Sequence, residues 1–254
     1  MKYSYIVILI LAVALSSCEK MGLQSSADSG NIGGGNSGTA GSMAKFSISN
    51  DHLFLINEKS LVVYNITNPA NPVEINKLEV EFGIETVFTL KGKLFIGSTG
   101  GVFIYDISNP ENILYLSHYE HITSCDPVVA NDTLAFATLN SQSQCRWQTG
   151  ANQLDVIDIS NIVYPQNITS IWLHDPKGLA IDSNLVFVCN GSKGVKIFDF
   201  SNPLQLYQVS GVAGIDAYDI ILQNKVMMLV GQDGLFQYDY NNINDIKLLS
   251  NILF

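Results

Sequence analysis

The sequence predicts an all-β protein built from five similar units, each of four short antiparallel strands. A motif in which β-branched and aromatic residues lead into an Asp/Asn turn, most complete in VFIYDISNP at residues 102–110, occurs five times. No stretch shows a sustained 3.6-residue hydrophobic period. The turn residue recurs at intervals of 41, 52, 41 and 40 residues, at Asn65, Asp106, Asp158, Asp199 and Asp239. A repeat of this length and composition is typical of the blades of a β-propeller.

Each unit divides into four strands, named a to d in chain order. In the second unit they are expected at residues 85–90, 93–98, 101–107 and 113–120, separated by turn-forming pairs. The five units are expected to cover about residues 44–82, 83–122, 123–174, 175–213 and 214–254. Because the first unit begins on strand a and the last ends on strand d, ring closure is expected to rest on face packing between the first and last blades. An open arc, or a latch formed in another strand phase, is left open.

The Asp/Asn turn has a structural explanation. A carboxylate or side-chain amide at the end of strand c accepts backbone N–H bonds from the turn, and the proline of D-I-S-N-P presets φ. A metal site is the less favoured interpretation, because each turn supplies one carboxylate and different blades hold the turns apart. No metal and no cofactor are expected.

These turns carry a family resemblance. VFIYDISNPENILYLSH, at residues 102–118, resembles the repeat of the LVIVD-repeat proteins, bacterial and archaeal surface proteins whose repeat reads roughly LVIVDISNPENPVLLGS. The resemblance extends over residues 43–254 and implies a β-propeller on the cell surface or in the periplasm. It transfers no catalytic residue, because the matched motif is structural. The third and fifth units depart from it, with Ile162 and Ile243 in place of the proline, which puts the tightness of those two turns in question.

The first 42 residues predict a secretory signal with a lipid-attachment site, followed by a flexible tether. Lys2 precedes an unbroken apolar run at residues 6–15, which is too short to span a bilayer and suits a secretory signal. The run ends in Leu15-Ser16-Ser17-Cys18, which resembles the lipobox of bacterial lipoproteins and implies lipidation of Cys18 after removal of residues 1–17. The alternative is an ordinary signal peptide with a chance cysteine.

The remainder of this region, up to residue 42, is rich in Gly, Ser and Asn and predicts a flexible tether. The propeller is expected over residues 43–254. We therefore expect a bacterial envelope protein, extracytoplasmic, on the outer membrane or cell surface, that meets the membrane through lipid alone.

Charge restricts the possible partners. The chain of 254 residues carries a formal net charge of −10, and only 14% of its residues are charged. An acidic surface repels phosphate backbones and anionic headgroups, so nucleic acid is not an expected partner.

The third unit is 11 residues longer than its neighbours, and the excess falls between strands b and c, at residues 139–153. Insertions in repeat proteins often lie on the binding face, and this one carries Arg146 and Trp147, residue types enriched at interaction surfaces. A solvated loop whose tryptophan packs on its own blade is the alternative. Cys125 precedes strand a and Cys145 follows strand b of the same blade, so the antiparallel pairing predicts a disulfide between them.

The loops from b to c and from d to the next a should emerge on one face of the ring. Alignment of the five units just ahead of strand a predicts a polar ring at the mouth of the central channel, where small ligands bind in concave sites. Acidic residues nearby are Glu85, Asp175, Asp216 and Asp219. The ring consists of Lys45, Thr86, Asp126, Lys177 and Tyr218.

The chain contains no G-x-S-x-G, H-E-x-x-H or P-loop sequence. We therefore expect a protein-interaction or ligand-binding module of the cell envelope, with an envelope protein or a glycan as its partner. The alternative is a glycan-active hydrolase or lyase that uses carboxylates at the channel mouth, with Glu85, Asp126 and Asp219 as the available acids.

Overall fold

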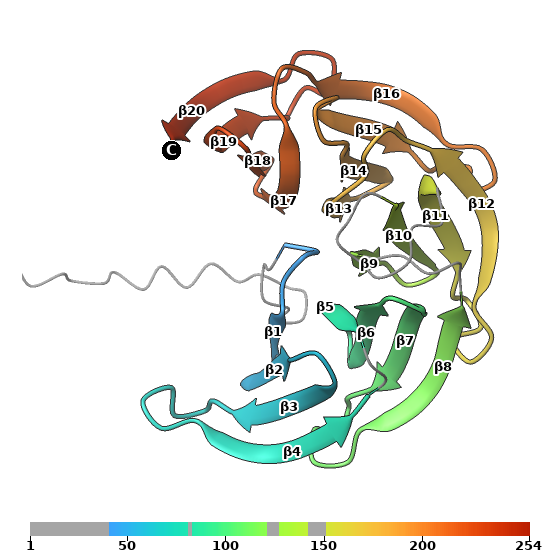
Figure 1. The fold of residues 1–254 in the computed structure, drawn as a ribbon, viewed down its shortest axis with the longest axis vertical. Helices are drawn as coiled ribbons and strands as arrows, with labels where there is room; N and C mark the ends of the chain where they lie inside the picture. The colour runs from blue at the N-terminus through green and yellow to red at the C-terminus, as the bar shows by residue number, and fades with distance from the viewer. Residues whose placement is uncertain (1–40, 81–82, 121–126, 142–150) are drawn as a thin grey trace, which may run out of the picture. The chain divides into compact units, whose positions relative to one another are not determined.

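The computed structural model describes residues 41–80, 83–120, 127–141 and 151–254. These residues form five four-stranded antiparallel sheets, arranged as the blades of a five-bladed β-propeller (Figure 1). They include no helix, and therefore none long and apolar enough to cross a membrane. The predicted fold class is confirmed.

The strands follow one another in the order a, b, c, d in every blade. Blade 1 comprises β1 (Phe46–Ser49), β2 (His52–Ile56), β3 (Ser60–Asn65) and β4 (Val73–Glu79). Blade 2 comprises β5 (Ile84–Leu90), β6 (Lys93–Ser98), β7 (Gly101–Asp106) and β8 (Leu114–Glu120). Blade 3 comprises β9 (Val128–Ala130), β10 (Leu134–Asn140), β11 (Asn152–Asp158) and β12 (Gln166–Trp172). Blade 4 comprises β13 (Leu179–Asp182), β14 (Leu185–Cys189), β15 (Val195–Asp199) and β16 (Tyr207–Val212). Blade 5 comprises β17 (Ala217–Gln223), β18 (Val226–Gly231), β19 (Gly234–Asp239) and β20 (Lys247–Leu253).

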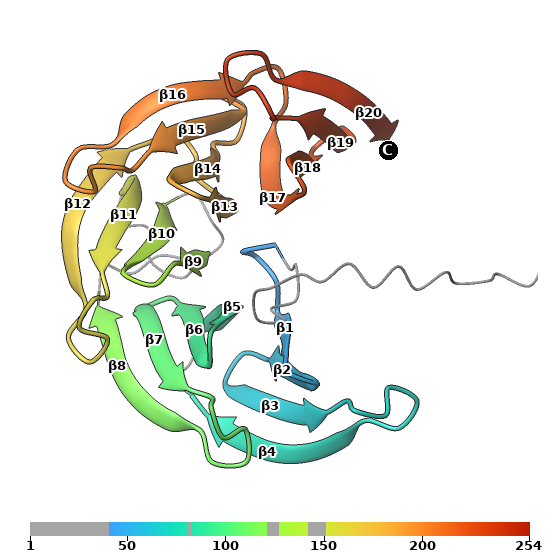
Figure 2. The same cartoon turned by 180° about the vertical axis from the view of Figure 1, so that it is seen from behind.

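Strand a of each blade lies on the inside of the ring and strand d on the outside, as both views show (Figures 1 and 2). The inner strands contact one another in series, β1 with β5, β5 with β9, β9 with β13 and β13 with β17. Every c–d pair contains a register shift at the same place, for example between Ile104 and Tyr105 in blade 2. A β-bulge increases the local twist of a strand. This recurring bulge therefore helps to shape the outer strand d in every blade.

The Asp/Asn turns have the predicted structure in all five blades. The side chain at the end of strand c accepts a hydrogen bond from the backbone N–H two residues later. The bonds are Thr67 N to Asn65 (2.9 Å), Ser108 N to Asp106 (2.8 Å), Ser160 N to Asp158 (2.8 Å), Ser201 N to Asp199 (2.7 Å) and Asn241 N to Asp239 (2.8 Å). The lengths in blades 3 and 5 match the others, so Ile162 and Ile243 in place of proline do not loosen those turns.

Hydrogen bonding also lowers the pKa of three of these carboxyls, Asp106, Asp158 and Asp199. The Lys93 ammonium donates to Asp106 Oδ2 at 2.6 Å and, with the Ser108 donors, lowers the pKa of Asp106 to about 2. The backbone N–H of Ser160 does the same for Asp158, which has a pKa below its ordinary value.

The core consists of layers between successive blades. Four buried apolar clusters join blade 1 to 2, 2 to 3, 3 to 4 and 4 to 5. Within the described ranges no such cluster joins blade 5 to blade 1, and the two sheets stand apart in both views (Figures 1 and 2). The expected closure by face packing of the end blades is therefore wrong for this structure.

A short segment ahead of β1, residues 41–44, instead links the inner strands. The backbone N–H of Leu179 in blade 4 donates to Ser42 Oγ at 2.7 Å, and Ser42 Oγ donates to Asp219 Oδ1 in blade 5 at 3.3 Å. The Val87 N–H of blade 2 donates to the Ala44 carbonyl at 3.0 Å. This leading segment therefore ties blade 1 to three other blades at the centre.

Candidate functional site

Lys177 lies where the d–a connection enters β13, and its backbone is fixed by two blades. Its N–H donates to the Cys189 carbonyl at 2.8 Å, and the Thr138 hydroxyl of blade 3 donates to the Lys177 carbonyl at 2.6 Å. Both bonds use main-chain atoms of Lys177. They hold its backbone in place and leave its side chain to make other contacts.

The Lys177 ammonium contacts two carboxylates and one aromatic ring. Its Nζ lies 3.1 Å from Asp175 Oδ2, 3.6 Å from Asp216 Oδ1 and 4.3 Å from the centre of the Tyr218 ring. The last contact is a cation–π interaction between blades 4 and 5. We call Lys177, Asp175, Asp216 and Tyr218 the Lys177 cluster. Two of the five residues expected at the channel mouth thus lie in contact.

Asp175 is held in place by blades 3 and 4. Asn140 Nδ2 donates to Asp175 Oδ1 at 2.6 Å, and Asn190 Oδ1 accepts the Asp175 N–H at 2.9 Å. Gly191 follows with φ +53°, and a Cβ there would lie 2.2 Å from Asp175 Oδ2. Glycine is therefore required on both backbone and steric grounds.

Asp216 contributes a buried oxygen that accepts no hydrogen bond from the residues described. Its Oδ1 is buried and forms an ion pair with the Lys177 ammonium at 3.6 Å. Buried acceptors in native proteins are normally satisfied. The Asp175 and Asp216 side chains are 18% and 30% exposed, so their accessible parts can receive a partner that brings hydrogen-bond donors.

Asp219 lies close by but is enclosed rather than open. Its carboxyl is packed between Gly41 and Gly178, where an added Cβ on either would lie 2.1 Å from a carboxyl oxygen. Burial raises the pKa of Asp219 to about 6, against bonds from Ile220, Ser42 and Met43 that lower it. A carboxyl covered in this way has little room for a substrate, which weighs against the hydrolase alternative.

The remaining predicted residues divide into two groups. Lys45 is exposed ahead of β1, whereas Thr86 is buried, with 4% exposure, so Thr86 does not line an open mouth. Asp126, Arg146, Trp147, Cys18 and the proposed Cys125–Cys145 pair lie outside the described residues. Strands β10 and β11 end and begin at Asn140 and Asn152, so the long connection falls where the sequence places it.

The alignment of Thr86 with Tyr218 is wrong by one residue. Both β5 and β17 carry a bulge, between Ile84 and Thr86 and between Ala217 and Asp219. Thr86 pairs with Gly97 as Asp219 pairs with Val230, so the bulged residues Glu85 and Tyr218 are the equivalent pair.

Cys189 is buried and free, and its burial raises the pKa of its thiol well above the ordinary value. No group of three or more metal-ligating side chains occurs in the part of the chain that the structure describes.

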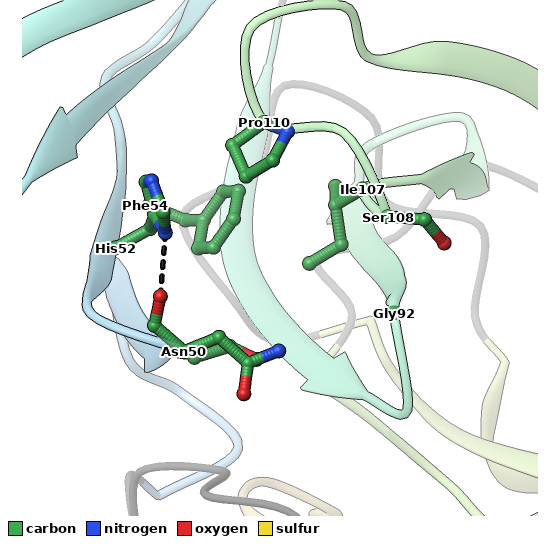
Figure 3. A pocket seen from close by; sticks show the side chains of 8 residues that line it. Asn50, His52, Phe54, Gly92, Ile107, Ser108 and Pro110 are labelled. Carbon is green, nitrogen blue, oxygen red and sulfur yellow. Dashed lines mark hydrogen bonds between the residues drawn. The ribbon is translucent and has the colours of Figure 1, made fainter.

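Small pockets lie at the opposite face, beneath the turns. One, of about 160 Å³, lies between blades 1 and 2 (Figure 3). His52, Phe54, Ile107 and Pro110 line it, and His52 Nδ1 lies 2.6 Å from the Asn50 carbonyl. Pockets of about 250 and 280 Å³ lie at the same level between blades 2 and 3 and between blades 4 and 5. Because they recur with the blade interface, we interpret them as a feature of the repeat.

Fold and site together define a β-propeller with a charged and aromatic cluster on its d–a loop face. The family model of the LVIVD repeat matches residues 40–79 and 149–171, which fall in blades 1 and 3. The predicted resemblance is confirmed for these two segments. Comparison with curated proteins gives no match.

Several solved structures share the fold. A functionally unknown protein from Desulfotomaculum acetoxidans is similar with a TM-score of 0.67 and 12% identity, over 83% of this chain and 69% of that one. A protein from Lactobacillus plantarum gives 0.62 and 11%, over 80% and 68%. Hsv2 from Kluyveromyces lactis gives 0.52 and 11%, over 80% of this chain and only 60% of its own length. At these identities the likeness shows the fold alone.

Proposed function

We propose that this protein is a lipid-anchored, extracytoplasmic binding module of the bacterial cell envelope, and that its Lys177 cluster belongs to the partner-binding surface. The observation that carries the proposal is the cluster itself, which three blades build and which brings one ammonium, two carboxylates and one aromatic ring into contact.

The chemistry of the cluster favours a partner that presents hydroxyl or N–H donors. A sugar ring can stack on Tyr218 while its hydroxyls donate to carboxylate oxygens, and a protein loop can offer amide or guanidinium N–H groups to the same acceptors. An envelope glycan and an envelope protein are thus the two partner classes to test.

Affinity capture from detergent-solubilised envelope tests the surface. The bait is the propeller with its tether, compared with a Lys177→Ala/Tyr218→Ala variant and an Arg146→Ala/Trp147→Ala variant. A matched control, Lys247→Ala/Tyr207→Ala, removes the same residue types from outer strands, where Lys247 and Tyr207 are exposed. Captured material is analysed for both proteins and glycans.

Retention of one partner by the wild type and the outer-strand control, with loss in the Lys177→Ala/Tyr218→Ala variant, is the expected result. Equal retention by all baits whose far-UV circular dichroism is unchanged would contradict the proposed surface. Loss in the Arg146→Ala/Trp147→Ala variant alone would move the surface to the inserted loop.

Lipidation of Cys18 is tested in a separate experiment. Support for it comes from the sequence, namely the apolar run at residues 6–15 and the small residues before Cys18. Growth with an alkyne-bearing fatty acid should label the wild type, and Cys18→Ser should lose the label and leave the membrane fraction. Label that persists in Cys18→Ser would contradict lipidation at this residue.

A further inference from the structure

Strand c of blade 3 departs from the repeat at two positions on the side that faces blade 2. Asp155 is one, because three other blades carry an apolar residue at its position in the register: Val62, Phe103 and Phe236. Gln153 is the other, because blades 2, 4 and 5 carry a glycine with positive φ at its position: Gly101, Gly194 and Gly234. The fold therefore does not require polar side chains here, and burying a carboxylate in place of an apolar group carries a desolvation cost.

Asp155 is a buried carboxylate, 2% exposed, that accepts three hydrogen bonds. Gln153 Nε2 donates to its Oδ1 at 2.6 Å, and the Ser170 hydroxyl donates to the same oxygen at 2.7 Å. The Tyr119 hydroxyl of blade 2 donates to Asp155 Oδ2 at 3.1 Å. Asn167 Nδ2 in turn donates to the hydroxyl oxygens of Tyr119 at 3.0 Å and Ser170 at 3.1 Å. Because a carboxylate only accepts hydrogen bonds, Asp155 sets the direction of every bond in this network.

The network uses N–H groups of the two amide side chains and leaves their oxygens for a ligand. Gln153 Oε1 and Asn167 Oδ1 make no hydrogen bond within the part of the chain that the structure describes. Asn167 and Ser170 are exposed, and Gln153 is half-buried. A ligand at this surface therefore meets acceptors whose orientation is already fixed, and it must bring hydrogen-bond donors.

Trp172 extends the same surface to the end of β12, the outer strand of blade 3 (Figure 1). Trp172 pairs with Gln153 and lies two residues from Ser170, so the three side chains lie on one side of the sheet. Its side chain is 72% exposed, although an indole ring is one of the largest apolar groups in proteins. The surface thus combines an open aromatic face with fixed acceptors. We call it the Trp172 row, which consists of Gln153, Asn167, Ser170 and Trp172.

We propose that the Trp172 row binds a neutral oligosaccharide. The indole face can stack on the C–H face of a sugar ring, while sugar hydroxyls donate to the amide oxygens. Asp155 is buried and already accepts three bonds, so the row presents uncharged groups, which favours a neutral ligand over a basic peptide. The net charge of −10 disfavours acidic sugars.

The length and the place of the row refine the proposal. Asn167 and Trp172 are five residues apart on one strand, so the row extends over roughly 15 Å, which favours several linked sugars over a single one. The row lies on an outer strand, whereas Lys177 and Tyr218 lie where the inner strands begin (Figure 1). It is therefore a second site, and it does not depend on the Lys177 cluster.

The fluorescence of Trp172 reports directly on the proposed site. The chain has two tryptophans, so Trp147→Phe leaves Trp172 as the only one. The full chain with this substitution, in a detergent without a sugar headgroup, is titrated with cellotetraose, chitotetraose, maltotetraose and mannotetraose, and separately with a short arginine peptide. At least one tetrasaccharide should change the emission saturably and reduce acrylamide quenching, and the peptide should do neither.

Isothermal titration calorimetry with the same sugar, on chains that keep Trp147, measures the affinity of each variant. Trp172→Ala should weaken binding more than about tenfold, and Gln153→Ala, which removes one acceptor, about three- to tenfold. Tyr207→Ala is the matched control, because Tyr207 is an exposed aromatic residue on the outer strand of blade 4. This control and Lys177→Ala/Tyr218→Ala should both bind as the wild type does. Far-UV circular dichroism verifies that each variant is folded.

Several results would overturn the proposal. A Trp172 emission that no tetrasaccharide changes would show that the row binds no such sugar, and a response to the arginine peptide alone would assign it to basic protein segments. Sugar binding that persists in Trp172→Ala, or that falls equally in Tyr207→Ala, would place the sugar elsewhere. Loss confined to Lys177→Ala/Tyr218→Ala would move the sugar to the Lys177 cluster, which would support the proposed function and refute this second site.

Discussion

Replacing Asp219 with asparagine should remove a pH dependence of folding that this enclosed carboxyl imposes. Burial raises the pKa of Asp219 from 3.8 to about 6 in the folded protein. The folded state therefore holds the proton more tightly than the unfolded state. The stability due to protonated Asp219 is fully present below about pH 4 and is lost as pH rises through 6.

A pKa difference of about 2 corresponds to ~3 kcal/mol. Asparagine keeps the size of the side chain and cannot ionise. Above pH 6 Asp219→Asn should consequently be more stable than the wild type by up to ~3 kcal/mol, and near pH 4 the two should be similar.

Urea unfolding of both proteins between pH 4 and 8 measures this difference directly. Other carboxyls, including Asp106 and Asp182, have pKa values below the ordinary one, so their effects fall at lower pH and cancel in the comparison. A difference in unfolding free energy that stays constant across the range would refute the argument. So would a variant that is less stable than the wild type at pH 8.

Four further substitutions test the site, the layered core and the turn. Gly191→Ala should displace Asp175 and cost more than about 1 kcal/mol, because φ is +53° and the new Cβ meets the carboxylate; urea unfolding and capture of the partner both report on it. Phe136→Ala should cost about 3–5 kcal/mol, as expected for a fully buried aromatic, whereas Met228→Ala on the uncovered face should change thermal stability little. Asp199→Ala removes the acceptor of the turn N–H and should cost about 1 kcal/mol above pH 4, an effect that fades in acid because the pKa of Asp199 is lowered.

For each of these substitutions, the opposite result would contradict one structural interpretation. An unchanged Gly191→Ala protein would show that Asp175 is not fixed by its neighbours. Equal losses for Phe136→Ala and Met228→Ala would show that blade 5 is covered in solution. A loss of stability in Asp199→Ala that does not change with pH would show that the ionised carboxylate of Asp199 does not stabilise the turn.

The repeat made the fold predictable, because each Asp/Asn turn marks the end of strand c and fixes the strands around it. Alignment of the units also placed Lys177 and Tyr218 in one ring, and the structure brings these two side chains into contact. What failed is non-local. The enclosure of Asp219 depends on residues 41–43, which are far away in sequence.

The uncovered faces of blades 1 and 5 were equally hard to predict. Leu53 and Leu55 follow the same alternating apolar pattern as the buried residues of strand b in the other blades. Gln237 was the one available signal, as a polar residue where the other strands c are aliphatic.

Photo-crosslinking at residue 218 tests the central claim most directly. A benzophenone-bearing phenylalanine replaces Tyr218 in the full chain, and in a control replaces Tyr207 on the outer strand β16. After irradiation of intact envelopes, the proposed surface predicts a crosslinked partner, protein or glycan, from position 218 and none from position 207. Crosslinking from position 207 alone, or to the same partner with equal yield from both positions, would contradict it.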